Sequence, residues 1–185
     1  MIPINTDELE RLIRRTGEGD MDALETLYKE LKDSIFGLAL MYTKSFSDAE
    51  DIVHDTFLAV WKSSSEFRKG APKAWIMKIA RNISLNFIKK QSRSRELDEN
   101  FASEDFCGKS EDSVMLMNLL KHLKESEREI VMLHAHGYSH EEIAKITGRP
   151  GATVRWKYSN AIKKLSEISG TPLATSSTAE FCETK

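Results

Sequence analysis

Apolar residues recur at steps of three and four along most of this 185-residue chain, whereas the alternation typical of strands is nearly absent. The clearest series runs through Leu24, Leu27, Tyr28, Leu31, Ile35, Leu38 and Tyr42, and Asp20 stands where a helix N-cap is expected. Side chains at this spacing share one face of a helix, and other helices must cover that face. The sequence therefore predicts an all-α fold.

Three Ser-x-x-Glu patterns predict the starts of further helices, because each can form a reciprocal capping box. They pair Ser47 with Glu50, Ser126 with Glu129, and Ser139 with Glu142. The last two predict helices over about residues 127–135 and 140–147. A tight turn at 148–151 then leads into a long helix after Pro150.

The helix that follows Ser47 is expected to be buried on one side and acidic on the other. The predicted inward residues are Ile52, Val53, Thr56, Phe57, Val60 and Trp61. The predicted outward residues are Glu50, Asp51, His54, Asp55 and Leu58.

A helix over about residues 73–90 is expected to carry a polar column opposite its apolar face. The apolar face consists of Trp75, Ile76, Ile79, Ala80, Ile83 and Phe87. The column consists of Lys78, Asn82, Asn86 and Lys89. The helix runs into the sequence KKQSRSR, which has more cations than a helix dipole needs and so indicates a polyanionic partner.

Charge is distributed in blocks although the whole chain has a net charge of only −2. Residues 62–95 carry ten basic side chains against one acid, and residues 137–165 carry six against two. Two basic surfaces indicate two contacts with nucleic acid. The predicted architecture is two small helical domains at 1–95 and 114–168, joined by a flexible acidic linker at 96–113 and followed by a disordered tail at 169–185.

The last two predicted helices follow the helix-turn-helix pattern. The final helix is expected to turn Val154, Tyr158, Ala161, Leu165 and Ile168 toward the core. Trp156 lies on the opposite side, between Arg155 and Lys157 and beside Ser159 and Asn160. Such cations and amides suit phosphates and base edges. An indole here suits contact with DNA or with a protein, and the sequence leaves both open.

Over about residues 20–168 the chain resembles the extracytoplasmic-function (ECF) group of bacterial RNA polymerase sigma factors. The segments LYKELKDSIFGLALMYTKSFSDAEDIVHDTFLAVWK and APKAWIMKIARNISLNFIKK resemble sigma region 2. The segment SHEEIAKITGRPGATVRWKYSNAIKKL resembles region 4. The resemblance implies a protein that binds core RNA polymerase and directs promoter-specific initiation, recognising the −10 element as opened single strand and the −35 element as duplex.

The resemblance also implies roles for single residues. Binding of core polymerase is expected from Asp51, His54 and Asp55, although a merely solvated acidic face is the alternative. Contact with −10 DNA is expected from Ser65, Phe67, Arg68, Lys78, Arg81, Asn82, Asn86 and Lys89. Contact with −35 DNA is expected from Thr153, Arg155, Trp156, Lys157, Ser159 and Asn160. Trp61 and Trp75 are expected in the core, with stacking on DNA as the alternative for Trp75.

One departure from the family concerns the reading helix. Family members usually have Gly-Thr-Val-Lys-Ser-Arg where this chain has residues 152–157, ATVRWK, so the −35 sequence is not carried over. The implied partners are core polymerase, promoter DNA and an anti-sigma factor, without a small-molecule substrate.

Two other classes of protein compete with this interpretation. A stand-alone helix-turn-helix regulator with a helical sensor domain accounts for the second half but leaves the basic helix near residues 73–90 unexplained. An enzyme is disfavoured: although His134, His136 and His140 lie close in sequence, Ala144 stands where the H-E-x-x-H zinc motif needs its second histidine. No catalytic residue, cofactor or metal is therefore expected.

The expected location is the cytoplasm. No apolar run reaches the roughly 20 residues that span a bilayer, and the N-terminus lacks the apolar stretch of a signal peptide. Direct insertion into a membrane is not expected, and an anti-sigma factor is the only implied route to the membrane.

Overall fold

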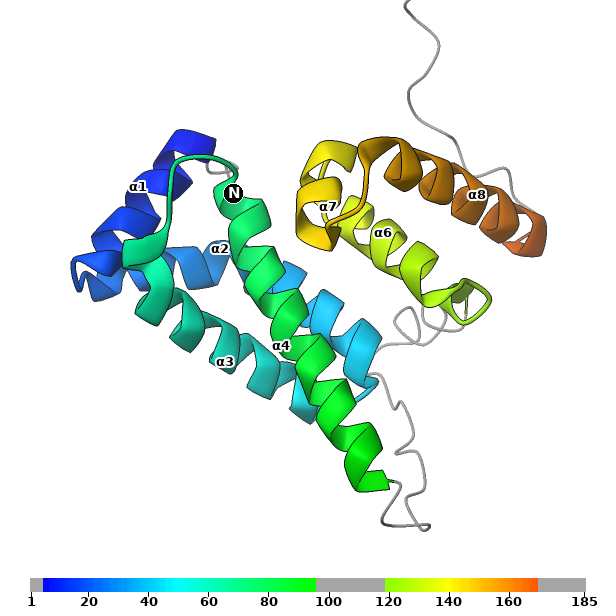
Figure 1. The fold of residues 1–185 in the computed structure, drawn as a ribbon, viewed down its shortest axis with the longest axis horizontal. Coiled ribbons are helices and arrows are strands. Elements are labelled where there is room, and N and C mark those ends of the chain that lie inside the picture. The colour runs from blue at the N-terminus through cyan, green and yellow to red at the C-terminus, as the bar shows by residue number, and fades with distance from the viewer. Residues whose placement is uncertain (1–4, 96–118, 170–185) are drawn as a thin grey trace, which may run out of the picture.

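A computed structural model describes residues 5–95 and 119–169, and within these ranges the regular structure is helical (Figure 1). The helices are α1 (Thr6–Gly17), α2 (Met21–Thr43), α3 (Phe46–Ser63), the 3-10 turn η1 (Ser64–Glu66), α4 (Pro72–Arg95), α6 (Glu125–Ala135), α7 (His140–Thr147) and α8 (Gly151–Ser169). The prediction of an all-α fold is confirmed. The predicted linker and all but the first residue of the predicted tail lie outside the described residues.

Helices α1 to α4 form the first unit, in which α2 packs against the other three (Figure 1). The core of this unit includes Leu27, Leu31, Ile35 and Leu38 of α2, as the periodicity predicts. The sequence analysis did not identify α1, although Leu9, Leu12 and Ile13 have helical spacing and are buried. The side chain of Asn5 caps α1, because its Oδ1 accepts from the backbone N–H of Glu8 at 2.8 Å.

The helix starts agree only in part with the predicted caps. Asp20 caps α2, and Ser139 and Glu142 form a reciprocal capping box at the start of α7, as predicted. The box at Ser47 is wrong, because Ser45 adopts the extended N-cap conformation and accepts from the N–H of Asp48. The box at Ser126 is also wrong: α6 starts at Glu125, two residues earlier than predicted, and Glu127 accepts from the N–H of Lys124. In both cases the serine lies inside the first turn.

Three residues of the predicted apolar faces are exposed. Tyr28 retains 38% of its surface, although its ring packs on Phe57. Trp61 retains 44% of its surface and Ile168 retains 45%, so the prediction that they face the core is wrong. Both lie in the last turns of their helices, where few neighbours remain to cover an apolar side chain. Trp75, by contrast, is half-buried and packs against the core, as expected.

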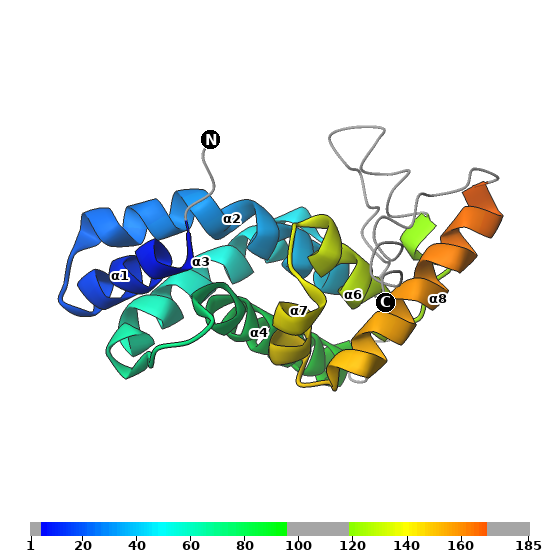
Figure 2. The same cartoon turned by 90° about the horizontal axis from the view of Figure 1, so that it is seen from above.

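Helices α6, α7 and α8 form the second unit, and it packs directly on the first. Helix α7 lies against α4, and α6 lies against the C-terminal part of α2 (Figures 1 and 2). One cluster of buried apolar side chains includes residues from both units. This contact between the units was not expected from the sequence, and it decides the surroundings of several predicted site residues.

Candidate nucleic-acid interface

The predicted polar column on α4 is exposed in the structure. Lys78, Asn82, Asn86 and Lys89 are all accessible, while Ile76 and Ala80 of the same helix are buried. The side chains of these four residues make no hydrogen bond or ion pair with another described residue. Two ammonium groups and two amides along one helix face are therefore free to contact phosphates and base edges.

Arg81 differs from this column, although it is one of the residues expected to contact the −10 element. It is half-buried, and its Nε donates a hydrogen bond to Oε1 of Glu129 on α6. Burial alone would lower the pKa of Arg81, but the hydrogen bond and the charge of Glu129 outweigh burial and raise it. In this arrangement the Arg81 guanidinium neutralises a protein carboxylate and is not free for a phosphate.

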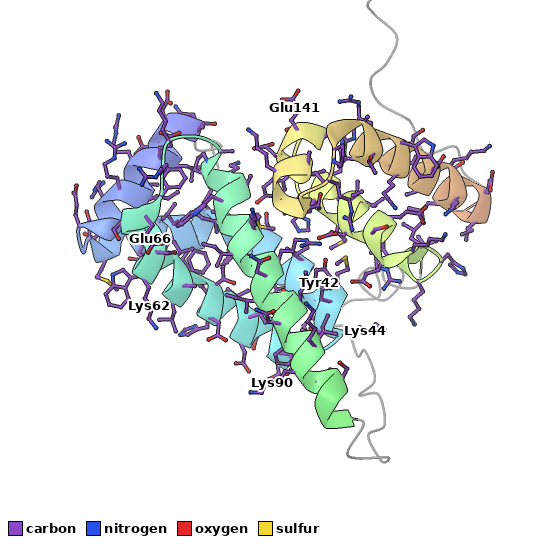
Figure 3. The ribbon with its side chains drawn as sticks, viewed as in Figure 1. Tyr42, Lys44, Lys62, Glu66, Lys90 and Glu141 are labelled. Atoms are coloured by element: carbon purple, nitrogen blue, oxygen red, sulfur yellow. The ribbon has the colours of Figure 1, made fainter. Side chains whose placement is uncertain are left out.

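Glu129 is the centre of a buried polar cluster between the two units, which we call the Glu129 cluster: Tyr42, Arg81, Glu129 and Arg149. Glu129 is only 1% exposed. The Tyr42 hydroxyl donates to its Oε1 at 2.8 Å, and Arg149 Nη1 donates to its Oε2 at 2.9 Å. Figure 3 shows Tyr42 where the end of α2 meets the second unit. Burial, followed by the charge of Glu129, raises the pKa of Tyr42, so this hydroxyl remains a donor.

The turn η1 and the loop that joins it to α4 carry the other three predicted −10 residues. Ser65 and Arg68 are exposed, whereas Phe67 is half-buried. The ring of Phe67 packs on Trp75 of α4 with 5.1 Å between centroids. The loop thus presents a hydroxyl and a guanidinium beside an aromatic pair, at the end of α4 that precedes the polar column.

The predicted polymerase-binding residues lie on the outer face of α3. Asp51, His54 and Asp55 are all exposed there. Leu58 and Trp61 lie at helical spacing from them and are also exposed. A merely solvated face has no need of an exposed leucine and tryptophan, so this mixed acidic and apolar strip is better suited to a protein partner. The sequence analysis missed Trp61 because it assigned every apolar side chain of this segment's inner stripe to the core.

The second unit has helix-turn-helix geometry. Gly148, with φ of 69°, ends α7 in the left-handed conformation, and α8 begins three residues later. Val154 and Ala161 are buried against the unit's core. His134 and His140 pack around the Tyr158 ring, with centroids 4.2 Å and 5.1 Å away. These histidines form an aromatic cluster, and the described ranges contain no group of three potential metal ligands.

The outer face of α8 carries the predicted −35 residues. Arg155, Trp156 and Ser159 are exposed, and Trp156 retains 63% of its surface. Thr153, Lys157 and Asn160 are partly exposed at the edges of this face. Lys157 Nζ donates to the Ser126 hydroxyl at 2.8 Å, which holds that cation close to α6. Helical spacing in the sequence predicted that Trp156 lies on the exposed side of the last helix, and that prediction is confirmed.

The comparisons with known proteins match both units. The sigma-70 region 2 family matches residues 27–94, and the sigma-70 region 4 family matches residues 113–165. A curated relative, the ECF RNA polymerase sigma factor SigK of Mycobacterium sp. (strain JLS), is 20% identical over 91% of this chain and 94% of its own length. SigK of Mycobacterium ulcerans (strain Agy99) is 20% identical over 88% of this chain and 94% of its own length.

Two solved structures share the fold. CnrH, in complex with the cytosolic domain of CnrY, aligns with a TM-score of 0.69 at 21% identity, over 88% of this chain and 97% of that one. The sigma factor RpoE of Bartonella quintana, in complex with the anti-sigma factor NepR, aligns with a TM-score of 0.65 at 26% identity, over 79% of this chain and 98% of that one. None of the described helices is long and apolar enough to cross a membrane.

Proposed function

This chain belongs to the ECF group of RNA polymerase sigma factors, and from that premise we propose how its two helical units bind polymerase and promoter DNA. It is a transcription initiation factor that binds core polymerase and directs initiation from specific promoters. The region 2 unit, within residues 1–95, contacts core polymerase and the −10 element. The region 4 unit, within residues 114–168, contacts the −35 element.

The observation that carries the −10 assignment is the exposed polar column of α4. Lys78 and Lys89 follow the phosphates, and Asn82 and Asn86 contact the exposed edges of unpaired bases. Ser65, Phe67 and Arg68 contribute from the adjoining loop, where a flipped base can be held. Arg81 joins this surface only after its guanidinium leaves Glu129.

The −35 assignment is carried by the exposed face of α8. Arg155 and Lys157 contact phosphates or guanine edges, Thr153, Ser159 and Asn160 contact neighbouring base edges, and Trp156 packs against sugars or thymine methyl groups. A helix-turn-helix places this face of its second helix in the major groove. Trp156 is thus proposed to contribute to the choice of −35 sequence.

Core polymerase is proposed to bind the outer face of α3. Asp51, His54 and Asp55 supply the polar contacts, and Leu58 and Trp61 supply exposed apolar surface. RpoE of Bartonella quintana is held by an anti-sigma factor. We propose an anti-sigma partner for this chain as well, binding the same exposed faces. Without a membrane span among the described helices, such a partner is the proposed link to any membrane signal.

Run-off transcription tests the proposed function. The full chain is mixed with sigma-free core polymerase and fragments of its source genome, and the 5′ ends of the transcripts are mapped. Discrete starts that share two upstream motifs are expected. Changing Asn82 and Asn86 together to alanine is expected to lower these transcripts at least about tenfold, because two base contacts of roughly 1 kcal/mol each are lost.

The matched control changes two exposed residues away from the column, Glu25→Ala with Lys29→Ala on α2, and should leave the transcripts unchanged. Binding of core without any transcript would contradict the promoter assignments. Neither core binding nor transcripts would contradict the function itself and favour a stand-alone regulator.

A further inference from the structure

Helix α1 precedes the segment that matches sigma region 2, yet it contacts the loop proposed to hold a −10 base. Figures 1 and 2 show α1 beside the connection that runs from η1 to the start of α4. Two of its residues, Glu10 and Gly17, lie against opposite ends of that connection.

Glu10 holds the far end of the loop. Its side chain is only 8% exposed, and its Oε1 accepts a hydrogen bond from the backbone N–H of Gly70 at 3.0 Å. A buried carboxylate is costly unless donors compensate it, so this charge-assisted hydrogen bond fixes the position of Gly70 relative to α1. Gly70 lies two residues before α4 begins, directly after the exposed Arg68 and Lys69.

Gly17 meets the near end of the loop. A Cβ atom at this position would lie 3.1 Å from the backbone nitrogen of Ser65 and 3.3 Å from the carbonyl carbon of Ser64. Such distances are tight against main-chain atoms, which cannot rotate away. The end of α1 therefore approaches η1 as closely as a residue without a side chain allows.

The loop between these two contacts contains Ser65, Phe67 and Arg68. Phe67 is held from a third side by the Trp75 ring. A loop fixed at both ends by α1 and in its middle by α4 keeps few alternative conformations. A base pocket made by loop residues discriminates between bases only when those residues are pre-positioned.

We propose that α1 is a positioning element for −10 recognition and that Glu10 is its positioning residue. Glu10 does not touch DNA; it holds the Gly70 end of the loop so that Ser65, Phe67 and Arg68 keep the arrangement that reads an unpaired base. This inference rests on the proposed function, because it assumes that the loop contacts the −10 element.

The test measures base preference instead of activity alone. A template library with random bases in the −10 element and a constant −35 element is transcribed by core polymerase with the full chain, and the transcribed templates are sequenced. Glu10→Leu fills the buried position without an acceptor. It is expected to reduce the preference at one or more −10 bases about tenfold, the order expected when one charge-assisted hydrogen bond is lost. Glu10→Gln keeps an acceptor oxygen and should retain most of the preference.

Glu8→Leu is the matched control, because Glu8 lies on the same helix and its carboxylate pairs with Arg11 near the surface. It should leave base preference unchanged. Gly17→Ala is the second variant. Alanine favours the helix more than glycine does, but its Cβ pushes against the η1 backbone. This variant should therefore reduce the same −10 base preferences, and it tests the proposal even if Glu10→Leu fails to fold.

Distinct results separate the possible failures. An even loss of transcription across all library members, or unchanged preference in both Glu10→Leu and Gly17→Ala, would overturn the positioning role. Altered −35 preference in these variants would overturn it as well, because the elements that α1 packs against, α2, α3, α4 and η1, belong to the first unit. Absence of both core binding and transcripts with the unmodified chain would refute the proposed function itself.

Discussion

Glu129 accepts hydrogen bonds from three segments that are far apart in the sequence. Tyr42 lies on α2, Arg81 on α4 and Arg149 in the turn before α8. A single buried carboxylate thus pairs with two guanidinium groups and accepts a hydrogen bond from one hydroxyl. Removing it leaves two cations without a counterion, and both retain enough exposure to recover part of their hydration.

Replacing Glu129 is therefore expected to destabilise the chain. Glu129→Ala should lower the free energy of unfolding by about 2–3 kcal/mol, at or slightly below the range for breaking a buried ion pair, because Arg81 and Arg149 can reach water. Urea denaturation followed by circular dichroism measures this change. Glu125→Ala, an exposed change on the same helix, is the control; an equal effect from both variants would show that the Glu129 cluster contributes little.

Unlike Glu129, Trp156 has a large exposed side chain that contributes little to the stability of the fold. Trp156→Ala should change the unfolding free energy by no more than about 0.5 kcal/mol, as for other exposed sites. It should lower transcription from promoters that depend on the −35 element, while Ile168→Ala on the same helix should not. Unchanged −35 dependence together with weakened binding of a protein partner would reassign Trp156 from DNA to protein.

At the scale of elements, helix starts depend on more than a capping pattern. Ser47 with Glu50 has the same Ser-x-x-Glu pattern as Ser139 with Glu142, but only the second pair caps a helix. Ser45 competes successfully with Ser47 because the chain leaves the left-handed Lys44 directly into an extended residue at 45. The Ser-x-x-Glu pattern shows which residues are able to cap a helix. The backbone conformation of the preceding residues decides which of them is the N-cap.

The contact between α6, α7 and α8 is expected to weaken in acid. Burial, then the nearby charges of His134 and Arg155, lower the pKa of His140 from its usual value of 6.5. The folded chain therefore binds this proton more weakly than the unfolded chain does. The stability from neutral His140 is fully present above about pH 6.5 and is lost as the pH falls through the lowered pKa.

Thermal unfolding measured between about pH 8 and about pH 5 tests this expectation. The midpoint of the unmodified chain should fall with acidification more steeply than that of His140→Gln, which cannot take up the proton. Parallel pH profiles for the two proteins would contradict it. His134 and Tyr158 pack on the His140 ring, so His134→Gln serves as a control for a change of packing within this aromatic cluster.

At the scale of the whole molecule, the two units pack closely at Gly37 of α2. A Cβ atom there would lie 2.7 Å from Cε1 of His136, whose ring also makes a hydrogen bond with the carbonyl of Met132 at 2.8 Å. Glycine is unfavourable inside a helix, so a larger residue at position 37 does not strain α2 itself. It strains the contact between the two units.

Gly37→Gln is expected to separate the two units without unfolding either. Small-angle X-ray scattering should show a larger radius of gyration, while the helical content by circular dichroism stays constant. Adding His136→Ala removes the obstructing ring and should restore the compact form. An unchanged radius of gyration in Gly37→Gln would mean that the units do not pack through this contact in solution.

The free chain is expected to bind promoter DNA weakly. Residues 1–57 carry 13 acidic against 6 basic side chains and so repel phosphates, and Arg81 and Arg149 are engaged with Glu129 in the packed form. A mobility-shift assay with the isolated chain should therefore show little complex at moderate salt, and addition of core polymerase should produce one. Tight binding by the chain alone that persists at high salt would contradict this expectation.

The sequence by itself determined most of the helices and many of their faces. Apolar spacing predicted α2 and α4 and the exposed positions of Asn82, Asn86 and Trp156, because helical periodicity is a local property of neighbouring residues. Cap patterns predicted the helices observed as α6 and α7, although the N-cap of α6 is a different residue. The order of the motifs along the chain resembles that of the sigma factor family. This resemblance agrees with the matches to sigma-70 regions 2 and 4.

Only the tertiary structure decided how the helices meet. The pairing of Tyr42 with Glu129 joins residues 87 positions apart, and that of Arg81 with Glu129 joins residues 48 positions apart. No periodic pattern records such pairs, because the apolar stripe of a helix shows which side is covered but not which helix covers it. For the same reason Arg81 resembled its exposed polar neighbours in the sequence, and Trp61 resembled a core residue. The contacts of Glu10 and Gly17 with the loop could not be predicted before α1 was placed beside it.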